Sequence, residues 1–385
     1  MRVTFISSYL NHHQLPFCEE MVKNLGDNFK YVATDRISKE RLKLGYEDMN
    51  SKYDFVIRSY ENDEEVYRLC NESDVVIIGS APKKYVANRI KRKNGITYTY
   101  SERLFKRKDF KSYFRKIYYI FIKERIQNDQ YFLLCASAFA SKDYGSMGLF
   151  KNRAFKWGYF PKINYYENID ALINKKESNS IVWVGRFIEA KHPEHVVFLA
   201  KRMKENHIDF HIKMVGTGVL FEYISDLIKS FHLEDNIQLL GSMPTDKVRT
   251  TMEKSKLFLF TSDKWEGWGA VLNEAMNSGC AVIANSQIGS VPFLVEDGFN
   301  GNIYSSLDDL YCITVKLLKD AKLTKKMGKN AYTTMLNVWS PKVAAERIIE
   351  VSKKLLEHTN PFIYENGPCS IAEPLDDNWY KSELG

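Results

Sequence analysis

Two acidic side chains in the second half of the chain could bind neighbouring hydroxyl groups. Glu266 comes just before a Gly-Trp-Gly turn, and Glu274 follows it with seven residues between them. We expect a helix over residues 270–277, with Glu266 in the loop ahead of it and Glu274 about one turn in. Carboxylates form paired hydrogen bonds with diols, and the amides at a helix start carry partial positive charge that suits phosphate. The spacing therefore favours a ligand with both hydroxyl and phosphate groups.

Two cations earlier in the sequence could hold the same kind of anion. Arg186 and Lys191 flank a loop that runs from the predicted strand 181–187 into a helix. Such a pair can clamp a diphosphate. Ordinary surface charges would give the same local sequence, so the pair alone does not decide between the two interpretations.

Two further strand ends carry turns that could line a ligand. Gly216 and Gly218 form a Gly-x-Gly turn, which lets backbone amides approach a phosphate closely. Ser242 and Met243 lie in the next strand-end turn, where they could border a nucleobase. A tight turn between a strand and a helix would explain either sequence without a ligand.

These loops follow short β-branched and aromatic runs that alternate with helical patterns, the order typical of parallel sheets wound with helices. The predicted strands cover residues 2–8, 29–33, 53–58, 74–79, 96–101 and 131–136, then 181–187, 211–216, 237–241, 257–261 and 281–284. Ligands bind beyond the carboxyl ends of such strands. We predict two Rossmann-like, doubly wound α/β domains facing a central cleft, over residues 1–165 and 178–340. A C-terminal helix and tail, 341–385, should cross back to the first domain.

The overall composition indicates the class of protein. A chain of 385 residues exceeds what one core usually organises, and 44% hydrophobic with 27% charged residues is typical of a soluble globular protein. The longest strongly apolar run, 117–122, is far shorter than the roughly 20 residues that span a bilayer. The N-terminus reads as a buried strand, and the six cysteines contain no Cys-x-x-Cys pair. We expect a cytoplasmic protein without zinc sites or disulfides.

Positive charge is concentrated in one segment. Residues 83–125 contain fifteen Lys and Arg against three acids, an excess of +12 within a net charge of +7, which leaves −5 for the rest of the chain. Cations interleave with aromatic residues over 104–121, as an interfacial helix requires. The apolar residues that would gather on one side are Leu104, Phe110, Phe114, Ile117 and Phe121. We predict binding to an anionic membrane surface at the inner face of the cell membrane, not to nucleic acid. A core-packed helix with a solvated basic face is the alternative.

Taken together, the motifs resemble the signature of the retaining GT-B glycosyltransferases of family 4, also called glycosyl transferases group 1. Residues 266–284 read E-G-W-G-x4-E-A-M-x-S-G-x-A-V-I-A, and residues 184–191 match the family's V-G-R-x4-K element. The glycine turn at 216–218 and the stretch 294–301 follow in the family's order. The resemblance covers about residues 180–340.

The resemblance implies a role for each candidate residue. Arg186 and Lys191 would hold the diphosphate of a nucleotide-sugar donor and stabilise the leaving nucleotide. Glu266 would act at the sugar hydroxyls and Glu274 at the ribose. The assisting backbone amides would be those of Gly267, Trp268 and Gly269. No Asp-x-Asp element occurs, so no metal is expected, and a UDP- or GDP-sugar is the co-substrate in place of a cofactor.

The first half departs from the family pattern. Many relatives carry a glycine-rich loop after the first strand, but residues 9–16 contain His12 and His13 instead. Either histidine could contact the acceptor or the phosphate. A histidine that relatives place after a later strand is missing from residues 97–103, where Glu102 or Arg103 could substitute.

The favoured function is a retaining hexosyltransferase that moves a sugar to a lipid-linked or oligosaccharide acceptor in bacterial surface polysaccharide biosynthesis. A sugar-nucleotide epimerase shares the fold but would not need the Glu266 and Glu274 arrangement. A non-catalytic module that binds a membrane or a nucleic acid through residues 83–125 is the third possibility.

Overall fold

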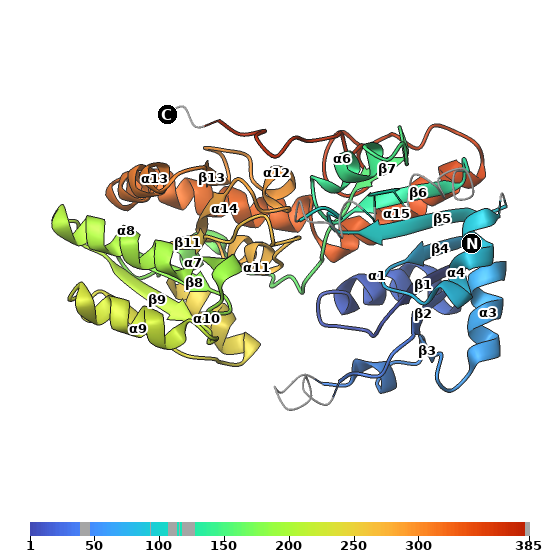
Figure 1. Ribbon diagram of the computed structural model, residues 1–385, viewed down its shortest axis with the longest axis horizontal. Helices are drawn as coiled ribbons and strands as arrows, with labels where there is room; N and C mark the ends of the chain where they lie inside the picture. Colours follow the sequence, from blue (N-terminus) through green and yellow to red (C-terminus); the bar gives the residue numbers. More distant parts are fainter. Residues whose placement is uncertain (39–46, 93, 107–113, 115, 118–127, 382–385) are drawn as a thin grey trace. The chain divides into compact units, whose positions relative to one another are not determined.

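The computed structural model describes residues 1–38, 47–92, 94–106, 114, 116–117 and 128–381. The chain forms two compact units (Figure 1). Unit 1 contains Met1–Lys162 and Ser340–Asp376, and unit 2 contains Ile163–Trp339 and Asp377–Gly385. The chain therefore passes from one unit to the other after residues 162, 339 and 376.

Unit 1 is built on a parallel sheet of seven strands among the described residues, in the order β3-β2-β1-β4-β5-β6-β7. The strands are β1 Val3–Ser7, β2 Phe29–Ala33, β3 Val56–Arg58, β4 Val75–Ile78, β5 Ile96–Ser101, β6 Tyr131–Cys135 and β7 Ala154–Lys156. The connecting helices are α1 Leu15–Leu25, α3 Asp63–Glu72, α4 Lys83–Lys91 and α6 Ala140–Gly145, with short 3-10 turns η1 Gly26–Asn28 and η2 Met49–Ser51.

Unit 2 repeats the scheme with six parallel strands in the order β10-β9-β8-β11-β12-β13. They are β8 Ser180–Val184, β9 His211–Val215, β10 Ile237–Leu239, β11 Leu257–Phe260, β12 Ala281–Asn285 and β13 Gly301–Tyr304. The helices and one 3-10 turn are α7 Ile169–Asn174, η3 Glu189–Lys191, α8 Pro193–Glu205, α9 Phe221–Ser230, α10 Thr245–Lys254, α11 Val271–Asn277, α12 Val291–Leu294, α13 Leu307–Lys319 and α14 Ala321–Asn337.

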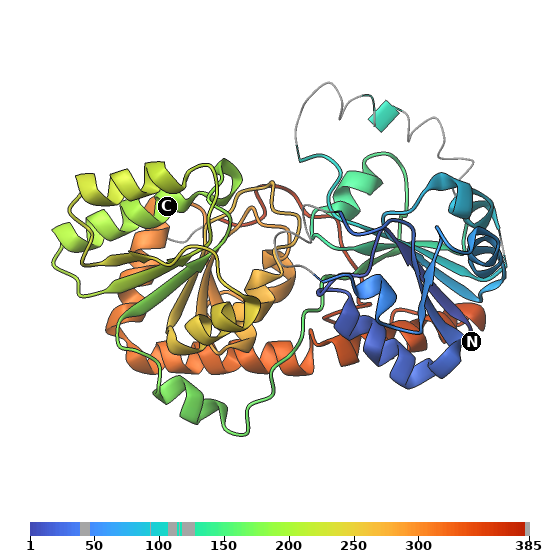
Figure 2. The same ribbon diagram turned by 90° about the horizontal axis from the view of Figure 1, so that it is seen from below.

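Both sheets are covered by helices on both faces, which explains why most of their strands are apolar along their length rather than alternating. All residues of β4, β6 and β11 are buried. Figure 2 shows α8 and α14 on opposite faces of the second sheet. In each unit the strand order reverses beside the first strand, between β1 and β4 and between β8 and β11. Such a reversal marks the ligand-binding edge of a doubly wound sheet.

The last helix, α15 Pro341–Leu356, belongs to unit 1 although it follows unit 2 in sequence. It packs against α1, and the hydroxyl of Ser352 lies 3.0 Å from the Tyr98 hydroxyl of β5. Residues 377–381 return to unit 2, where the Trp379 indole donates to the Ser286 carbonyl at 2.9 Å. The tail predicted as one piece, 341–385, is thus divided between the two units.

Every strand predicted from the sequence is present, with ends that differ by up to three residues. The prediction missed β7 and β13. The region 305–358 forms the three helices α13, α14 and α15. Most of the predicted interfacial helix, 104–121, lies outside the described residues. No helix within the described ranges is both long enough and apolar enough to cross a bilayer.

Candidate functional site

The candidate residues of unit 2 lie in the loops that follow β8, β9, β10 and β11, and on α11. Backbone hydrogen bonds join three of these loops in a row. The Gly185 amide donates to the Val215 carbonyl at 3.0 Å, and the Gly216 amide donates to the Gly241 carbonyl at 2.8 Å. The loops after β8 and β11 meet where the strand order reverses. The sheet therefore gathers the predicted residues at one edge.

The centre of this edge is an ion pair between Lys191 and Glu266. The ammonium group of Lys191 contacts Glu266 Oε2, and the two side chains are 18% and 16% exposed. The Ser262 hydroxyl donates to the same carboxylate oxygen at 3.3 Å. A partly buried pair of this kind presents a cation and an acceptor side by side, which suits a ligand with anionic and hydroxyl groups.

Buried polar contacts hold the loop of Lys191 against the loop of Glu266. The Thr261 hydroxyl donates to the Lys191 carbonyl at 2.6 Å, and the Trp183 indole of β8 donates to the Thr261 oxygen at 2.8 Å. The Asp263 amide also donates to the Ala190 carbonyl at 3.2 Å. The ion pair is thus supported by the core of unit 2.

Two of the predicted glycines are required by the backbone itself. At Gly216 the φ angle is +131°, and a Cβ atom would lie 1.9 Å from the Gly185 carbonyl oxygen. At Gly269 the φ angle is +79°, and a Cβ atom would lie 2.2 Å from the Phe260 ring. Close packing therefore explains both glycines even without a ligand.

Glu274 lies in the first turn of α11 and is partly buried. Burial raises the pKa of its carboxyl, and the charge of Arg249 opposes that shift. The Arg249 guanidinium donates to the Glu274 backbone carbonyl and not, among the contacts described, to its carboxylate. The carboxylate oxygens of Glu274 thus remain suited to accept hydrogen bonds from a diol.

Arg186 is exposed, and the part of the chain that the structure describes provides no ion pair for its side chain. It follows β8 by two residues and precedes the buried Phe187. The loop therefore holds its backbone in place while the guanidinium extends into solvent.

Trp268, Ser242 and Met243, three further predicted residues of unit 2, differ in how deeply their side chains are buried. The Trp268 side chain is fully buried, and its indole donates to Asn273 Oδ1 at 2.9 Å. Only the backbone of Trp268 could then contribute to a site. Ser242 is exposed, whereas Met243 is partly buried beside Thr251.

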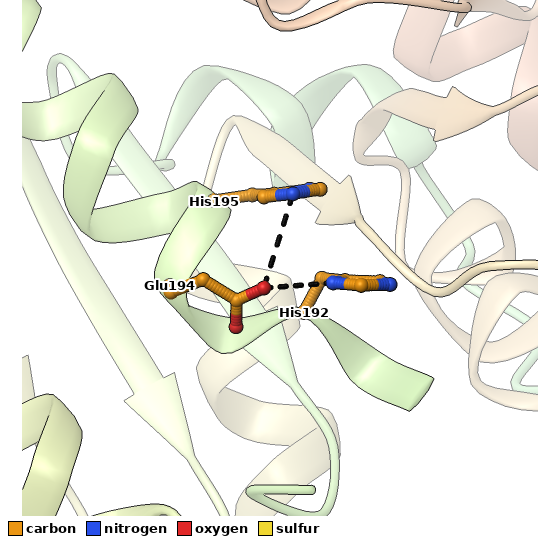
Figure 3. Close-up of side chains that lie close together, drawn as sticks. All are labelled: His192, Glu194 and His195. Carbon is orange, nitrogen blue, oxygen red and sulfur yellow. Dashed lines mark hydrogen bonds and ion pairs between the residues drawn. The ribbon is translucent and has the colours of Figure 1, made fainter. Parts of the chain in front are cut away.

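A cluster that sequence reasoning did not single out lies next to Lys191. His192, Glu194 and His195 come together at the start of α8 (Figure 3). His192 Nδ1 lies 2.7 Å from Glu194 Oε1, and the two imidazole rings stack with centroids 4.6 Å apart. The sequence signal was the His-Pro-Glu-His run itself.

In unit 1, an unpredicted tyrosine joins three of the four predicted residues. The Tyr159 hydroxyl donates to Glu102 Oε1 at 2.8 Å. The centroid of the Tyr159 ring lies 6.0 Å from that of the His13 ring, and the His13 and His12 ring centroids are 3.8 Å apart. The fourth residue is held elsewhere. The Arg103 side chain is 5% exposed and lies 3.8 Å from Asp143.

Comparison with known proteins gives a family match for one part of the chain. Residues 166–334 match the model of the family described as glycosyl transferases group 1. These residues lie within unit 2 and include the site described above.

Two similar proteins match over less than their full length. A region of 192 residues is 30% identical to an uncharacterized glycosyltransferase, MJ1178, of Methanocaldococcus jannaschii, covering 49% of this chain and 51% of that protein. A region of 154 residues is 32% identical to the N-acetyl-alpha-D-glucosaminyl L-malate synthase of Bacillus anthracis, covering 39% of each chain. The matched regions thus span about half of these relatives or less.

Solved structures extend the likeness to most of the chain. The crystal structure of HepE from Anabaena in complex with UDP aligns with a TM-score of 0.68 and 15% identity, covering 92% of this chain and all of that one. HepE has also been solved with UDP-glucose. The predicted fold class, two doubly wound α/β domains of the GT-B type, is confirmed by this likeness and by the two sheets.

Proposed function

Because residues 166–334 belong to the glycosyl transferases group 1 family, we propose that this protein transfers a sugar from a nucleotide-sugar donor to a glycan or glycolipid acceptor. The observation that carries the proposal is the Lys191 and Glu266 pair at the strand-order reversal of unit 2. An ammonium and a carboxylate held together there can separate around a ligand, one toward a phosphate and the other toward sugar hydroxyls.

The proposed roles follow from charge and exposure. Arg186, exposed, and Lys191 bind the donor diphosphate and stabilise the nucleotide as it leaves with growing negative charge. Glu266 accepts hydrogen bonds from the sugar and Glu274 from the ribose. The backbone amides between Gly267 and Gly269 assist at the phosphates.

We further propose a UDP-sugar donor, transfer with retention of anomeric configuration, and no need for a metal. HepE binds UDP and UDP-glucose in its crystal structures, which supports a uridine nucleotide. Arg186 and Lys191 supply the positive charge that a divalent ion would otherwise bring to the diphosphate. NMR of the anomeric proton of the product tests retention.

In unit 1 we propose that His13, Tyr159 and Glu102 border the acceptor. Their contacts bring together a ring nitrogen, a carboxylate and a phenol from the segments that follow β1, β5 and β7, respectively. Hydroxyl-rich acceptors are bound by groups of this kind. Arg103 is not part of this proposal, because its guanidinium lies against Asp143 and the Phe139 ring.

We also propose a weak peripheral association with anionic membranes through residues 83–125, in keeping with a glycolipid acceptor. Two of the fifteen cations, Arg89 and Arg103, are buried, which leaves at most thirteen for a membrane surface. Each cation close to an anionic leaflet contributes about 1 kcal/mol. The interaction would therefore be electrostatic and sensitive to salt.

Incubation with a panel of labelled nucleotide sugars tests the main proposal. A transferase hydrolyses its own donor slowly when no acceptor is present, and the nucleotide is released. Conversion of the sugar within an intact nucleotide sugar would instead indicate an epimerase. If every donor stays unchanged and unbound, the chain is a binding module and the proposal is wrong.

A further inference from the structure

His192 lies between two carboxylates, one at each ring nitrogen. Its Nδ1 is 2.7 Å from Glu194 Oε1, and its Nε2 is 3.4 Å from Asp263 Oδ2. A neutral imidazole has a single N–H, so one carboxylate would face a nitrogen lone pair. Only the doubly protonated ring donates to both carboxylates.

The two carboxylates belong to different loops of the site. Glu194 lies on α8, directly after the loop of Lys191, whereas Asp263 lies in the loop after β11. The Asp263 carbonyl accepts a hydrogen bond from the Glu266 amide at 3.0 Å. His192 therefore follows Lys191 directly in sequence. Its ring contacts Asp263, whose carbonyl is bound by the Glu266 amide.

The backbone of His192 marks the start of α8. Its φ and ψ angles are 47° and 54°, in the left-handed region, which His207, His232 and His358 of this chain also enter with positive φ. The backbone conformation alone is therefore no sign of a role for the side chain. The sign is the pair of contacts that the ring makes with Glu194 and Asp263.

The charges around His192 agree with the protonated form. The hydrogen bond with Glu194, more than the contact with Asp263, raises the pKa of His192. Burial would raise the pKa of Glu194, but the hydrogen bond with His192, a backbone hydrogen bond and the charges of the two histidines together outweigh it, and that pKa is lowered. Burial, and then the charge of His192, lower the pKa of His195.

The other titratable groups nearby do not reverse this balance. Lys191 is next in sequence, but its ammonium is paired with Glu266. Glu189 precedes it on η3 and is exposed. Tyr304 of β13 is buried, and its phenol has a raised pKa from burial and, to a lesser extent, from the charge of Glu194.

A metal ion could in principle take the place of the proton, because ligand atoms of His192, Glu194 and His195 lie within 4.8 Å of one another. The ring orientation argues against it. The nitrogen lone pairs of histidine lie in the ring plane, and the two planes are only 10° from parallel with centroids 4.6 Å apart (Figure 3). Nearly parallel planes do not converge on one ion beside the rings.

We infer that His192 is a positioning residue which, with both ring nitrogens protonated, fastens the loop of Lys191 to the loop of Glu266. The inference rests on the proposed donor site and adds a pH-dependent control to it. Below the ordinary pKa of histidine the bridge is fully formed, and it is lost as the pH rises through the raised pKa of the folded protein.

NMR titration of the histidine ring protons tests the bridge without any enzymatic assay. His192→Asn, which tolerates the left-handed backbone, identifies the signal. The titration midpoint of His192 should lie above 6.5 in the wild type and fall in both Glu194→Gln and Asp263→Asn. A wild-type midpoint at or below 6.5, or one unmoved by either variant, overturns the inference. So does Zn²⁺ that binds at one equivalent and shifts His192 and His195 together.

Kinetics with the donor identified by the panel then test positioning. His192→Asn should raise the donor KM roughly fivefold, about the loss of one hydrogen bond, and change kcat less than twofold. Wild-type KM should rise similarly above the His192 midpoint, whereas the variant should show no such rise. The matched control is His195→Asn, because His195 stacks on His192 without contacting Asp263.

The two experiments separate this inference from the proposed function. A shifted His192 midpoint with no transfer to any acceptor would leave the bridge standing and remove the glycosyltransferase. Transfer activity with an unchanged KM in His192→Asn, or a fall confined to kcat, would leave the glycosyltransferase function standing and remove the positioning role of His192.

Discussion

Glu274 is a carboxylate on α11 that is partly shielded from water, and the nearby charge of Arg249 only partly offsets this burial. Burial raises its pKa above the ordinary value, so its ionised form is less favourable in the folded chain than in the unfolded one. The free energy of unfolding therefore decreases as the pH rises through this pKa, and the deficit persists at neutral pH. Such a cost is typical of a binding residue.

Substitution Glu274→Gln should separate activity from stability. We expect turnover to fall about 100-fold or more, since a charged contact to the donor is lost. The melting temperature at pH 7.5 should stay the same or rise, because the amide has no charge to desolvate. Differential scanning fluorimetry and donor turnover measure both. Activity above half that of the wild type would exclude Glu274 from the site.

Arg186, in contrast to Glu274, is an exposed charged residue, and the described residues provide no ion pair that its substitution would break. Arg186→Ala should leave the melting temperature within a degree or so, yet reduce kcat/KM by roughly 100-fold, because positive charge at the leaving diphosphate is removed. Lys229→Ala is the control, since Lys229 is 65% exposed in the last turn of α9 and belongs to none of the loops that carry the site residues. Equal activity of the two variants would contradict a role for Arg186.

The same cations lead to a prediction about metals. If Arg186 and Lys191 neutralise the diphosphate, saturating EDTA should leave most of the activity intact. Turnover is measured before and after treatment, with re-addition of Mn²⁺ or Mg²⁺. Complete loss of activity that either ion restores would show that the protein cations are insufficient.

At the scale of elements, one buried lysine joins the ends of two helices. The Lys176 ammonium donates to the carbonyls of Met252, Glu253, Ser255 and Ser278 at 2.9–3.1 Å, and its residue is 6% exposed. These carbonyls lie at or just after the carboxyl ends of α10 and α11, where carbonyl groups outnumber the amides of their own helix. Lys176 thereby anchors the helix that carries Glu274.

Lys176→Met should be strongly destabilising. The apolar side chain fits the volume but removes the ammonium donor that four buried carbonyl groups share, so the free energy of unfolding should fall by about 3 kcal/mol or more. Urea denaturation measures the change. Lys175→Met is the matched control, because Lys175 is the adjacent residue and is exposed. Similar stabilities of the two variants would show that the carbonyls find other partners.

These elements also show how far the sequence could lead. Apolar β-branched runs predicted the longer strands, whereas β7 has only three residues and β13 begins with a glycine, so neither has a clear local pattern. Two short spacings, from Arg186 to Lys191 and from Glu266 to Glu274, together with the family resemblance singled out Lys191 and Glu266, but not their contact with each other. The carbonyl contacts of Lys176 and the contact between His192 and Asp263 had no such signal, because these partners lie 76 to 102 and 71 residues away in sequence, respectively.

At the scale of the whole molecule, charge is distributed unevenly between one segment and the rest. The purified protein should co-sediment with phosphatidylglycerol vesicles but not with phosphatidylcholine vesicles, and 0.5 M salt should release it. The variant Arg107→Glu, Lys108→Glu and Lys111→Glu changes the charge by −6 within residues 83–125, and its binding should be lost.

The control for this prediction reverses the same number of charges elsewhere. Lys322, Lys325 and Lys326 are exposed on α14, and their replacement by glutamate should leave vesicle binding close to that of the wild type. Equal loss in both variants would mean that only net charge matters. Binding to neutral vesicles would point to an apolar contact instead of an electrostatic one.

The divided course of unit 1 affects how the protein is made. Helix α15 covers α1, but the ribosome must first synthesise the whole of residues 163–339. At about 5–20 residues per second, adding residues 163–376 takes roughly 10–40 s after Lys162. During that time the apolar side of α1 lacks its cover, while unit 2 already has its full sheet. The unit encoded second is thus the first that can complete its core, and nascent unit 1 is the part most exposed to chaperones and to aggregation.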